Sequence, residues 1–315
     1  MPNPARQRIA ILDDWQNVAL RIAEWATLTP RADITAFNDH LDDRAALAAR
    51  LRPFDILCVM RGRTPLPREL LQLLPALKLI VSTGRRNASI DAAAAAERGI
   101  AIAYTGYSST PTIELTFALI LASARHVASE AASLRGGGWQ QAIGGNLRGK
   151  TLGVLGLGNI GADLARLGCA FGMEVIAWSE NLTPERAEAA GARLVEKPEL
   201  FRRSDILTIH LVLSGRTRGL VGSAELGLMK PTARLVNTAR GPIVDEAALI
   251  AALEAGAIAG AALDVFDREP LPQGHPFRSL KNVLATPHIG YVSEDLYRIF
   301  YGDAVQAIDA FLSGG

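Results

Sequence analysis

Residues 151–161 constrain the fold more than any other part of the sequence. A short apolar run is followed by Gly156, Gly158 and Gly161 in the spacing G-x-G-x-x-G, and apolar side chains then recur at helical spacing over residues 160–171. In a strand–turn–helix unit that binds a dinucleotide, the first glycine permits the tight turn and the second lets the pyrophosphate approach the backbone. The third lets the helix pack closely on the sheet, and the N–H groups that begin the helix hold the phosphates. We therefore predict a dinucleotide site.

Length and composition bound the class of protein. The 315 residues suggest two domains, and 49% apolar with 21% charged residues is typical of a globular chain. A net charge of +1 offers no electrostatic reason to expect nucleic acid or a membrane surface as a partner. Cys58 and Cys169 lie far apart in apolar runs, so we expect buried thiols rather than a disulfide or a metal site. The first six residues lack the apolar core of a signal peptide, and no apolar run reaches the length of a membrane span, so a cytoplasmic protein is expected.

Strands and helices alternate along the first third of the chain. This alternation predicts parallel βαβ units with right-handed crossovers. The strands are expected at 8–12, 33–37, 55–60, 78–82 and 100–103, and the helices between them at 15–28, 42–51, 67–74 and 91–98.

A second alternating region follows a helix predicted at 110–127, with Thr110 as N-cap, and a glycine-rich loop at 135–149. Its strands are expected at 151–155, 174–178, 193–195, 206–209, 233–237, 258–263 and 282–285, and its helices near 160–171, 184–190, 197–203, 223–229 and 245–255. A long amphipathic helix at 293–312 is expected to return to the first domain.

These patterns predict an α/β fold with two doubly wound parallel-sheet domains. We expect a flavodoxin-like substrate domain at 1–104 plus 291–315, and a Rossmann dinucleotide-binding domain at 105–290. Ligands of such sheets bind beyond the carboxyl ends of the strands, so residues at those ends are the candidates for function.

Three side chains at predicted strand ends have the chemistry that hydride transfer to a carbonyl acid needs. Arg240 offers a planar cation that can bind a carboxylate and polarise a carbonyl. His288 can donate a proton to the developing alkoxide, and Glu269 can hold the tautomer of that histidine and favour its protonated form. Each of these residues alone could be an ordinary loop or capping residue, but all three occur behind a dinucleotide motif.

With these motifs in view, the sequence resembles the D-isomer-specific 2-hydroxyacid dehydrogenase family, which includes D-phosphoglycerate dehydrogenases and glyoxylate/hydroxypyruvate reductases. The resemblance rests on residues 156–161, 237–241, 264–270 and 286–290. It implies that Arg240 binds and polarises the substrate and that His288 and Glu269 form the acid/base pair. It also implies a further set of cofactor-binding residues, namely Asn159, Ile160, His210, Thr217, Thr238, Ala239, Asp264 and Gly290, beside Gly156, Gly158 and Gly161.

The ribose end of the cofactor site departs from the family pattern. The NAD-using members usually carry Asp at the end of the second strand, where this chain has Ser179 followed by Glu180. An acidic residue there accepts from the ribose 2′-OH and repels a 2′-phosphate. Glu180 therefore favours NAD as cofactor, with NADP as the alternative.

The resemblance also implies that loops of the first domain form half of the substrate site. Arg61 follows the third predicted strand, and Thr83, Gly84 and Arg85 follow the fourth. The family's loop at 82–87 offers backbone N–H groups to the substrate carboxylate, which a glycine-containing turn can do physically. Arg85, with the arginine after it, replaces the small apolar residues that the family usually has after the glycine.

The expected function is reversible interconversion of a small 2-oxoacid and its D-2-hydroxyacid, with hydroxypyruvate or glyoxylate as the first candidates. Two alternatives remain: a phosphoglycerate dehydrogenase acting on a phosphorylated acid, and a non-catalytic NAD-sensing protein like the corepressors related to this family. A formate-dehydrogenase-like activity is disfavoured because the formate-oxidising relatives replace the glutamate partner with an amide, and Glu269 is present. The resemblance also implies a homodimer.

Overall fold

The computed structural model describes residues 6–314; residues 1–5 and 315, which the predicted domain bounds include, lie outside the described residues. The chain forms two compact units, one of residues 1–108 with 292–315 and one of residues 109–291. The predicted bounds lie at 104–105 and 290–291. We describe each unit by itself.

Unit 1 contains a five-stranded parallel sheet in the order β2-β1-β3-β4-β5. This is the flavodoxin-like strand order, and it confirms the predicted fold class of this unit. The strands are β1 (Gln7–Ile11), β2 (Ala32–Ala36), β3 (Ile56–Val59), β4 (Leu79–Ser82) and β5 (Ala101–Tyr104). The helices are α1 (Ala19–Ile22), η1 (Trp25–Leu28), α2 (Arg44–Leu51), α3 (Arg68–Leu71), α4 (Ala92–Glu97) and α12 (Glu294–Leu312).

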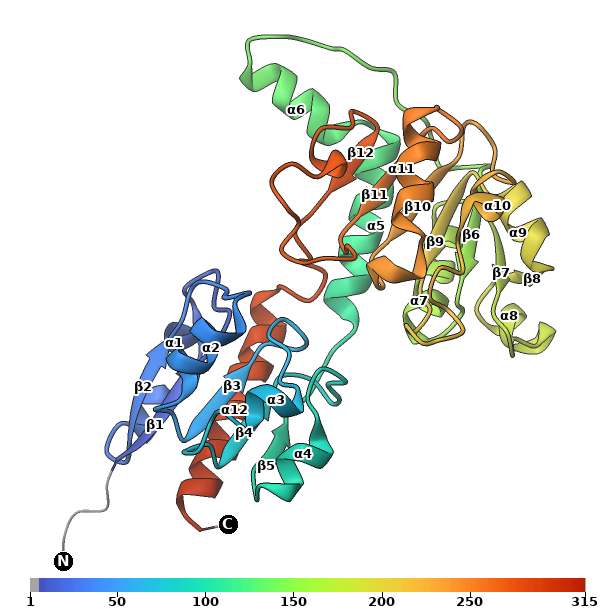
Figure 1. Ribbon diagram of the computed structural model, residues 1–315. Helices are drawn as coiled ribbons and strands as arrows, with labels where there is room; N and C mark the ends of the chain where they lie inside the picture. Colours follow the sequence, from blue (N-terminus) through green and yellow to red (C-terminus); the bar gives the residue numbers. More distant parts are fainter. Residues whose placement is uncertain (1–5, 315) are drawn as a thin grey trace, which may run out of the picture. The chain divides into compact units, whose positions relative to one another are not determined.

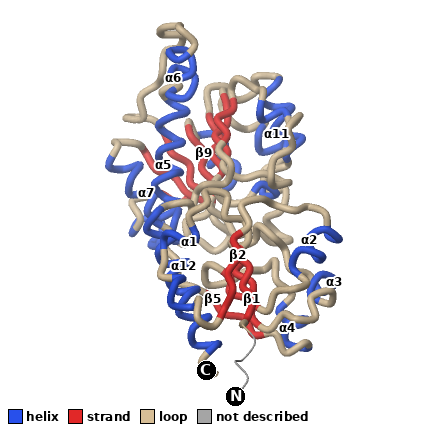
Figure 2. The backbone as a smooth tube through the Cα atoms, turned by 90° about the vertical axis from the view of Figure 1, so that its left-hand side faces the viewer, coloured by secondary structure: helices blue, strands red, loops and turns tan. Residues whose placement is uncertain are grey.

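Helices cover both faces of the unit 1 sheet. Helices α2, α3 and α4 lie on one side of the strands, whereas α1 and α12 lie on the other (Figure 2). The last helix, α12, packs on α1 and β4, so the end of the chain completes the unit formed by its first hundred residues (Figure 1). Central strands β3 and β4 are therefore buried on both faces, which explains their continuous apolar runs.

The predicted helix at 15–28 is wrong, because the structure breaks this segment into α1 and η1. The carboxylate of Asp14 accepts from the N–H groups of Val18 and Ala19, which places the helix start after Asn17. The Trp25 indole then donates to the Ala19 carbonyl, a buried contact that turns the chain between the two helical pieces. Tertiary contacts here override the local helical spacing.

Unit 2 contains a seven-stranded parallel sheet in the order β12-β11-β10-β9-β6-β7-β8. Counted from β6, this is the Rossmann order with one added strand, and it confirms the predicted fold class. The strands are β6 (Thr151–Leu155), β7 (Glu174–Trp178), β8 (Arg193–Leu194), β9 (Ile206–Ile209), β10 (Arg234–Asn237), β11 (Gly260–Leu263) and β12 (Val283–Ala285).

Two apolar layers enclose this sheet. Helices α5 (Thr110–Ala124), α7 (Asn159–Ala170) and α8 (Pro184–Ala189) supply one layer. The opposite layer comes from α9 (Lys197–Arg203), α10 (Ser223–Leu226) and α11 (Glu246–Glu254). Figure 2 shows α5 and α7 on one side of the strands of this unit and α11 on the other.

The predicted helix at 110–127 is also interrupted. Helix α5 ends at Ala124, His126 takes a left-handed conformation with φ 56°, and a second helix, α6 (Val127–Arg135), starts in a new direction. Ser109, rather than the predicted Thr110, occupies the N-cap position of α5. Figure 1 shows α6 and the following loop projecting away from the sheet of unit 2.

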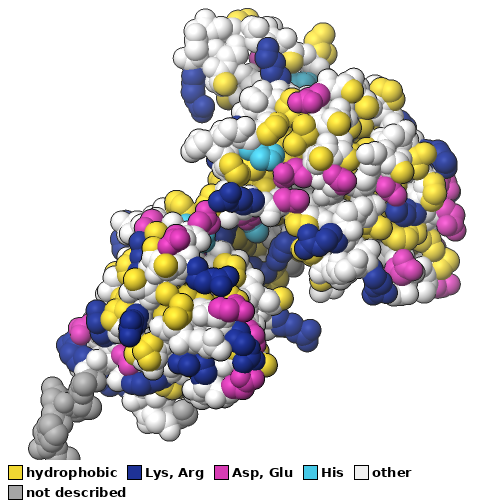
Figure 3. Space-filling view, viewed as in Figure 1, with side chains coloured by type: hydrophobic (Ala, Val, Ile, Leu, Met, Phe, Trp, Pro, Cys, Tyr) yellow, Lys and Arg dark blue, Asp and Glu magenta, His cyan; other side chains and the backbone are white. Residues whose placement is uncertain are grey.

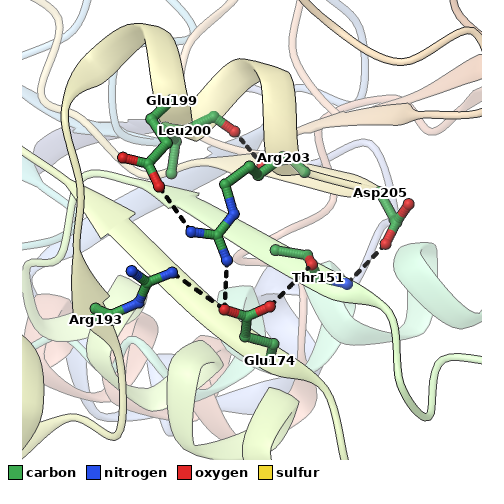
Figure 4. A network of polar contacts seen from close by, with 8 residues as sticks. Thr151, Glu174, Arg193, Glu199, Leu200, Arg203 and Asp205 are labelled. Carbon is green, nitrogen blue, oxygen red and sulfur yellow. Dashed lines mark hydrogen bonds and ion pairs between the residues drawn. The ribbon is translucent and has the colours of Figure 1, made fainter.

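The amino ends of the unit 2 strands are joined by ion pairs (Figure 4). Arg203 bridges Glu174 of β7 and Glu199 of its own helix, and the Glu174 carboxylate also contacts Arg193 of β8. Burial alone would raise the pKa of Asp205, but hydrogen bonds from Lys230 and from the Thr151 N–H outweigh it and hold that pKa below its usual value. These contacts stabilise the edge of the sheet opposite to the strand ends at which ligands bind.

Surface charges are mixed in sign. On the face shown in Figure 3, acidic and basic side chains are interspersed over each unit. Among residues 6–314, no helix has both the length and the apolar character needed to cross a membrane.

Candidate active site

The glycine turn after β6 has the geometry that its sequence predicts. Gly156 has φ 105°, and a Cβ there would lie 2.7 Å from the His210 carbonyl carbon at the end of β9. A Cβ on Gly161 would lie 2.2 Å from the Gly156 carbonyl oxygen. Any side chain at either position would therefore push the turn away from its neighbours.

Gly158 differs from the other two glycines, because a Cβ built there would have no atom within 4 Å. Gly158 is the exposed N-cap of α7, whose first residues are Asn159 and Ile160. The helix start thus presents backbone N–H groups beside open space, as a pyrophosphate site requires. The residues present fit a dinucleotide.

We predict that Gly158→Ala weakens NADH binding without destabilising the fold. The added methyl group occupies open space in the protein alone but would obstruct the approach of a pyrophosphate. The expected increase in Kd for NADH is at least about tenfold, or ~1.4 kcal/mol, by fluorescence titration. Gly302→Ala, also with no atom within 4 Å of the new Cβ, serves as control and should leave Kd unchanged. An unchanged Kd in Gly158→Ala would contradict the predicted phosphate site.

Ser179 and Glu180 follow β7 but have different surroundings. The Ser179 hydroxyl accepts from the Leu157 N–H at 2.9 Å, so this side chain braces the glycine turn. Glu180 is exposed. Only Glu180 of these two residues carries a charge, and its exposed carboxylate is accessible to a ribose.

The segment after β9 contributes His210 and Thr217. Burial lowers the pKa of His210 to about 3, so its imidazole is neutral, and its Nε2 lies 2.7 Å from the Thr208 hydroxyl. The Thr217 hydroxyl accepts from the Ser214 N–H and donates to the Val212 carbonyl at 2.7 Å. Thr217 therefore closes its own loop.

Arg240 stands at the end of a short turn that Asn237 builds. The buried Asn237 side chain accepts from the Ala239 N–H and donates to the Arg240 carbonyl, both at 3.0 Å. Thr238 is buried, and its hydroxyl shares a 2.7 Å hydrogen bond with the Thr116 hydroxyl of α5. The Arg240 side chain is exposed, with Nη1 donating to the Ala239 carbonyl. The guanidinium is thus directed outward from a fixed turn.

His288 and Glu269 form the predicted pair. The Nδ1 atom of His288 lies 2.5 Å from Oε2 of Glu269, and the two side chains are 19% and 21% exposed. The second oxygen of Glu269 accepts from the Phe266 N–H at 3.0 Å. The Tyr291 ring meets the imidazole edge to face, with centroids 5.6 Å apart. With Nδ1 directed at the carboxylate, Nε2 is the ring nitrogen suited to exchange a proton with a ligand.

Asp264 anchors the loop that carries His288. This carboxylate is completely buried and accepts from the Thr286 hydroxyl and the Ile289 N–H through Oδ1, and from the Gly290 N–H through Oδ2. Burial raises the pKa of Asp264, although these hydrogen bonds oppose the rise. His288 has φ 54°, an unusual conformation that bonds on both sides of it help to hold.

The catalytic candidates come together because their strands are neighbours. Strands β10, β11 and β12 pair in parallel, and the Asp264 N–H donates to the Asn237 carbonyl at 2.9 Å. A Cβ on Gly241 would lie 2.1 Å from the Phe266 carbonyl carbon, so the Arg240 turn rests directly on the Glu269 segment. The Arg240 cation, the His288 imidazole and the Glu269 carboxylate thus lie at one edge of the unit 2 sheet.

The unit 1 candidates form a second loop cluster. Arg61 has φ 50°, donates its N–H to the Thr83 hydroxyl at 2.9 Å, and places its guanidinium 5.0 Å from the centre of the Tyr107 ring. Gly84 has φ 83°, and its N–H donates to the Thr105 hydroxyl. The Gly84 N–H is therefore already engaged within unit 1, whereas the next residue, Arg85, is exposed.

Sequence reasoning missed several residues that shape these sites. The motif around 237–241 includes Asn237, but its use as the builder of the turn is visible only from its bonds. Thr286 belongs to the histidine motif, and its contact with Asp264 was not predicted. Tyr291 directly follows the motif, and its contact with His288 was not predicted either. The Thr286 contact joins the ends of different strands, so no spacing rule signals it. The Asn237 bonds are local, and the preference of asparagine for such turns was the signal that could have found them.

Comparison with known proteins agrees with this geometry. The family model for the NAD binding domain of D-isomer specific 2-hydroxyacid dehydrogenases matches residues 117–290 of the sequence. A glyoxylate reductase of Aeropyrum pernix is 41% identical over 256 residues, which are 78% of this chain and 76% of that protein. The chain belongs to the D-isomer-specific 2-hydroxyacid dehydrogenase family.

Other members of the D-2-hydroxyacid dehydrogenase family match over different lengths. A D-3-phosphoglycerate dehydrogenase of Methanocaldococcus jannaschii is 40% identical over 253 residues, 79% of this chain, but the match spans only 48% of that relative's length. The crystal structure of a phosphoglycerate oxidoreductase from Vibrio cholerae O395 has a TM-score of 0.93 at 38% identity and covers 98% of this chain and 100% of that one.

Family membership confirms NAD as the cofactor and oxidoreductase as the class of enzyme. The reaction class is the NAD-dependent interconversion of 2-oxoacids and 2-hydroxyacids. The names of the relatives include both glyoxylate reductases and phosphoglycerate dehydrogenases.

Proposed function

We propose that this protein reduces a small, unphosphorylated 2-oxoacid, with His288 as proton donor, Glu269 as its partner and Arg240 as the substrate-binding cation. The observation that carries the proposal is the contact of His288 Nδ1 with the Glu269 carboxylate, on the same sheet edge as the Arg240 turn. Bound NADH would supply the hydride. His288 would give a proton to the carbonyl oxygen, and Arg240 would orient the acid and stabilise the charge that develops.

The remaining predicted residues would hold the two ligands. Gly156, Gly158, Gly161, Asn159 and Ile160 would hold the pyrophosphate, since they form the turn and helix start. The other cofactor contacts would come from the residues at the remaining strand ends, namely Ser179, Glu180, His210, Thr217, Thr238, Ala239, Asp264 and Gly290. The residues of unit 1 that would bind the carboxylate of the substrate are Arg61, Thr83, Gly84 and Arg85.

The contacts of Arg61 support the unphosphorylated acid. Its guanidinium stacks on Tyr107 and lies against Gly84, where a Cβ would come 2.6 Å from Nη1. An arginine that packs against the neighbouring loops after β4 and β5 is less available to a phosphate than one directed outward. We therefore rank hydroxypyruvate and glyoxylate above a phosphorylated acid.

The test is kcat/KM for glyoxylate, hydroxypyruvate and phosphohydroxypyruvate with NADH, in the wild type and in Arg61→Ala. We expect hydroxypyruvate or glyoxylate to be the better substrate. A preference for phosphohydroxypyruvate that disappears in Arg61→Ala would reverse the ranking. NADH binding without turnover of any of the acids would instead favour the non-catalytic NAD-sensing alternative.

We predict that the enzyme prefers NADH to NADPH and that Glu180 is responsible. The exposed carboxylate beyond β7 would repel a 2′-phosphate. Glu180→Ala should reduce the ratio of kcat/KM for NADH to that for NADPH by about tenfold, which corresponds to ~1.4 kcal/mol. Glu188→Ala, which removes an exposed carboxylate from α8, is the control. Better activity of the wild type with NADPH would refute the assignment.

We also propose a cytoplasmic homodimer, in which α6 and the loop 136–149 pack against a second copy. Four apolar side chains of this arm are exposed: Val127 at 53%, Leu134 at 61%, Trp139 at 71% and Ile143 at 98%. Such a cluster is typical of an interface. Both cysteines are free thiols, which agrees with a reducing compartment. Cys58 is buried as predicted, but the predicted burial of Cys169 is wrong, because this residue is exposed near the end of α7.

The dimer predicts a result for solution mass. Light scattering should give twice the chain mass for the wild type and the monomer mass for the double variant Trp139→Glu, Ile143→Glu, because the charges oppose burial of the arm. Leu73→Glu, at a 48% exposed apolar residue outside the arm, should remain dimeric. A monomeric wild type at micromolar concentration would exclude the proposed interface.

A further inference from the structure

The segment that carries Glu269 is a long connection between β11 and β12. It runs from residue 264 to 282 and contains one short helical turn, η3 (Pro276–Arg278). Long irregular connections open more easily than strands or helices, whereas a catalytic pair needs a fixed geometry. Contacts outside the pair must therefore hold this segment.

Two such contacts come from Glu246, the first residue of α11. Its Oε1 lies 3.0 Å from His275 Nε2, and its Oε2 accepts from the Asp267 N–H at 3.4 Å. In this hydrogen-bonded pair, Glu246 is 25% exposed and His275 is 13% exposed. Residues 267 and 275 lie on either side of Glu269, so one carboxylate contacts the segment both before and after Glu269.

The orientation of the His275 ring is determined by its own backbone. The Phe277 N–H donates to His275 Nδ1 at 3.2 Å, so Nδ1 must be the unprotonated nitrogen. Nε2 then carries the proton and donates to Glu246. The ring also packs on Phe277, with centroids 4.9 Å apart, and Phe277 is buried in the core of unit 2.

The segment packs on the core of unit 2 through Phe266 and Phe277, but this packing leaves a gap. A small cavity lies beside it, lined in part by Asn237, Gly241, Glu246, Phe266, Asp267 and Phe277. This cavity reaches from the Glu246 contacts to the turn that precedes Gly241. Loss of the Glu246 contacts would therefore leave the segment room to shift, and Glu269 would shift with it.

We propose that Glu246 and His275 are a positioning pair for the acid/base couple of His288 and Glu269. The inference rests on the proposed function, because it concerns residues that act through Glu269. The carboxylates around the His288 imidazole are Glu269, in direct contact, and Asp264, which is close enough to interact with it electrostatically. The groups that interact electrostatically with Asp267 are Glu246, Arg218, Asp245 and His275, and Glu246 itself contacts His275.

The test compares kcat, KM and the pH profile of 2-oxoacid reduction in His275→Ala, Glu246→Gln and Glu269→Gln. We expect His275→Ala to lower kcat by about tenfold, the effect of a displaced catalytic group, with KM for NADH unchanged within about twofold. The alkaline limb of the profile should move to lower pH, because a displaced carboxylate favours the imidazolium of His288 less. Glu246→Gln should have a smaller effect in the same direction.

Two further variants separate positioning from stability. His275→Gln can still donate to Glu246 and should recover most of kcat. Lys197→Met breaks the ion pair of Lys197 with Glu225, which has a similar length of 2.8 Å and similar exposure of 26% and 22%. This control should lower Tm without changing kcat or the pH profile.

A double-variant cycle tests whether His275 acts through Glu269. In the Glu269→Gln background, His275→Ala should change kcat by less than about twofold. If His275→Ala lowers Tm but leaves kcat and the pH profile as in Lys197→Met, the positioning role is refuted while the acid/base pair stands. If Glu269→Gln itself leaves the profile unchanged, the acid/base assignment fails, and the positioning role fails with it.

Discussion

Replacing His288 with alanine is expected to lower kcat for 2-oxoacid reduction by about 10²–10⁴-fold, the contribution of a positioned general acid. The Nδ1 contact with Glu269 and the edge contact with Tyr291 fix this ring, so the variant removes a pre-oriented proton donor. The Kd for NADH should change by less than about threefold, since the glycine turn lies on other strands. Steady-state kinetics and fluorescence titration measure the two quantities.

Glu269→Gln tests the same pair by removing the charge of the carboxylate while keeping the size of the side chain. An amide can still accept a hydrogen bond but carries no charge, so protonation of His288 is less favoured. The alkaline limb of the reduction profile should therefore move to lower pH.

His126→Ala is the matched control for His288→Ala, because it also removes an imidazole from unit 2. His126 starts α6 and contacts Arg234. Near-wild-type turnover in His288→Ala would end the assignment of this residue as the proton donor.

Arg240→Lys is expected to lower kcat/KM by about 10²–10³-fold, the usual cost of losing one group that stabilises developing charge. Lysine keeps the charge but loses the planar fork that binds a carboxylate through two parallel hydrogen bonds. The turn itself should persist, because Asn237 bonds the backbone of residues 239 and 240 rather than the guanidinium. Circular dichroism and kinetics together measure both effects.

Arg186→Lys provides the comparison for the arginine variant. Arg186 is exposed on α8, so the same chemical change there should leave kcat/KM within about twofold. If Arg240→Lys retained wild-type kcat/KM with hydroxypyruvate and glyoxylate, another cation would have to bind the acid. Arg85 of unit 1, which is exposed, would then be the next candidate.

Much of the fold could be predicted because its signals are local. The strands at 151–155, 174–178 and 206–209 agree with the structure residue for residue, since each is a short apolar run between turn residues. The errors at 15–28 and 110–127 have a different origin. There, the Asp14 side chain and the left-handed His126 interrupt stretches whose spacing is helical throughout.

The candidate site divides in the same way. The requirement for glycine at 156 and the suitability of arginine, histidine and glutamate for hydride-transfer chemistry follow from the residue types themselves, so the sequence alone was sufficient to determine them. Only the tertiary structure shows that Asp264 holds the residues on both sides of His288, and that Glu246 contacts the chain both before and after Glu269. These contacts join residues about 20 to 30 positions apart, and they exist because β10, β11 and β12 are neighbours in the sheet. Apolar spacing marks each strand separately but contains no information about which strands pair, so the contacts between their ends could not be predicted from it.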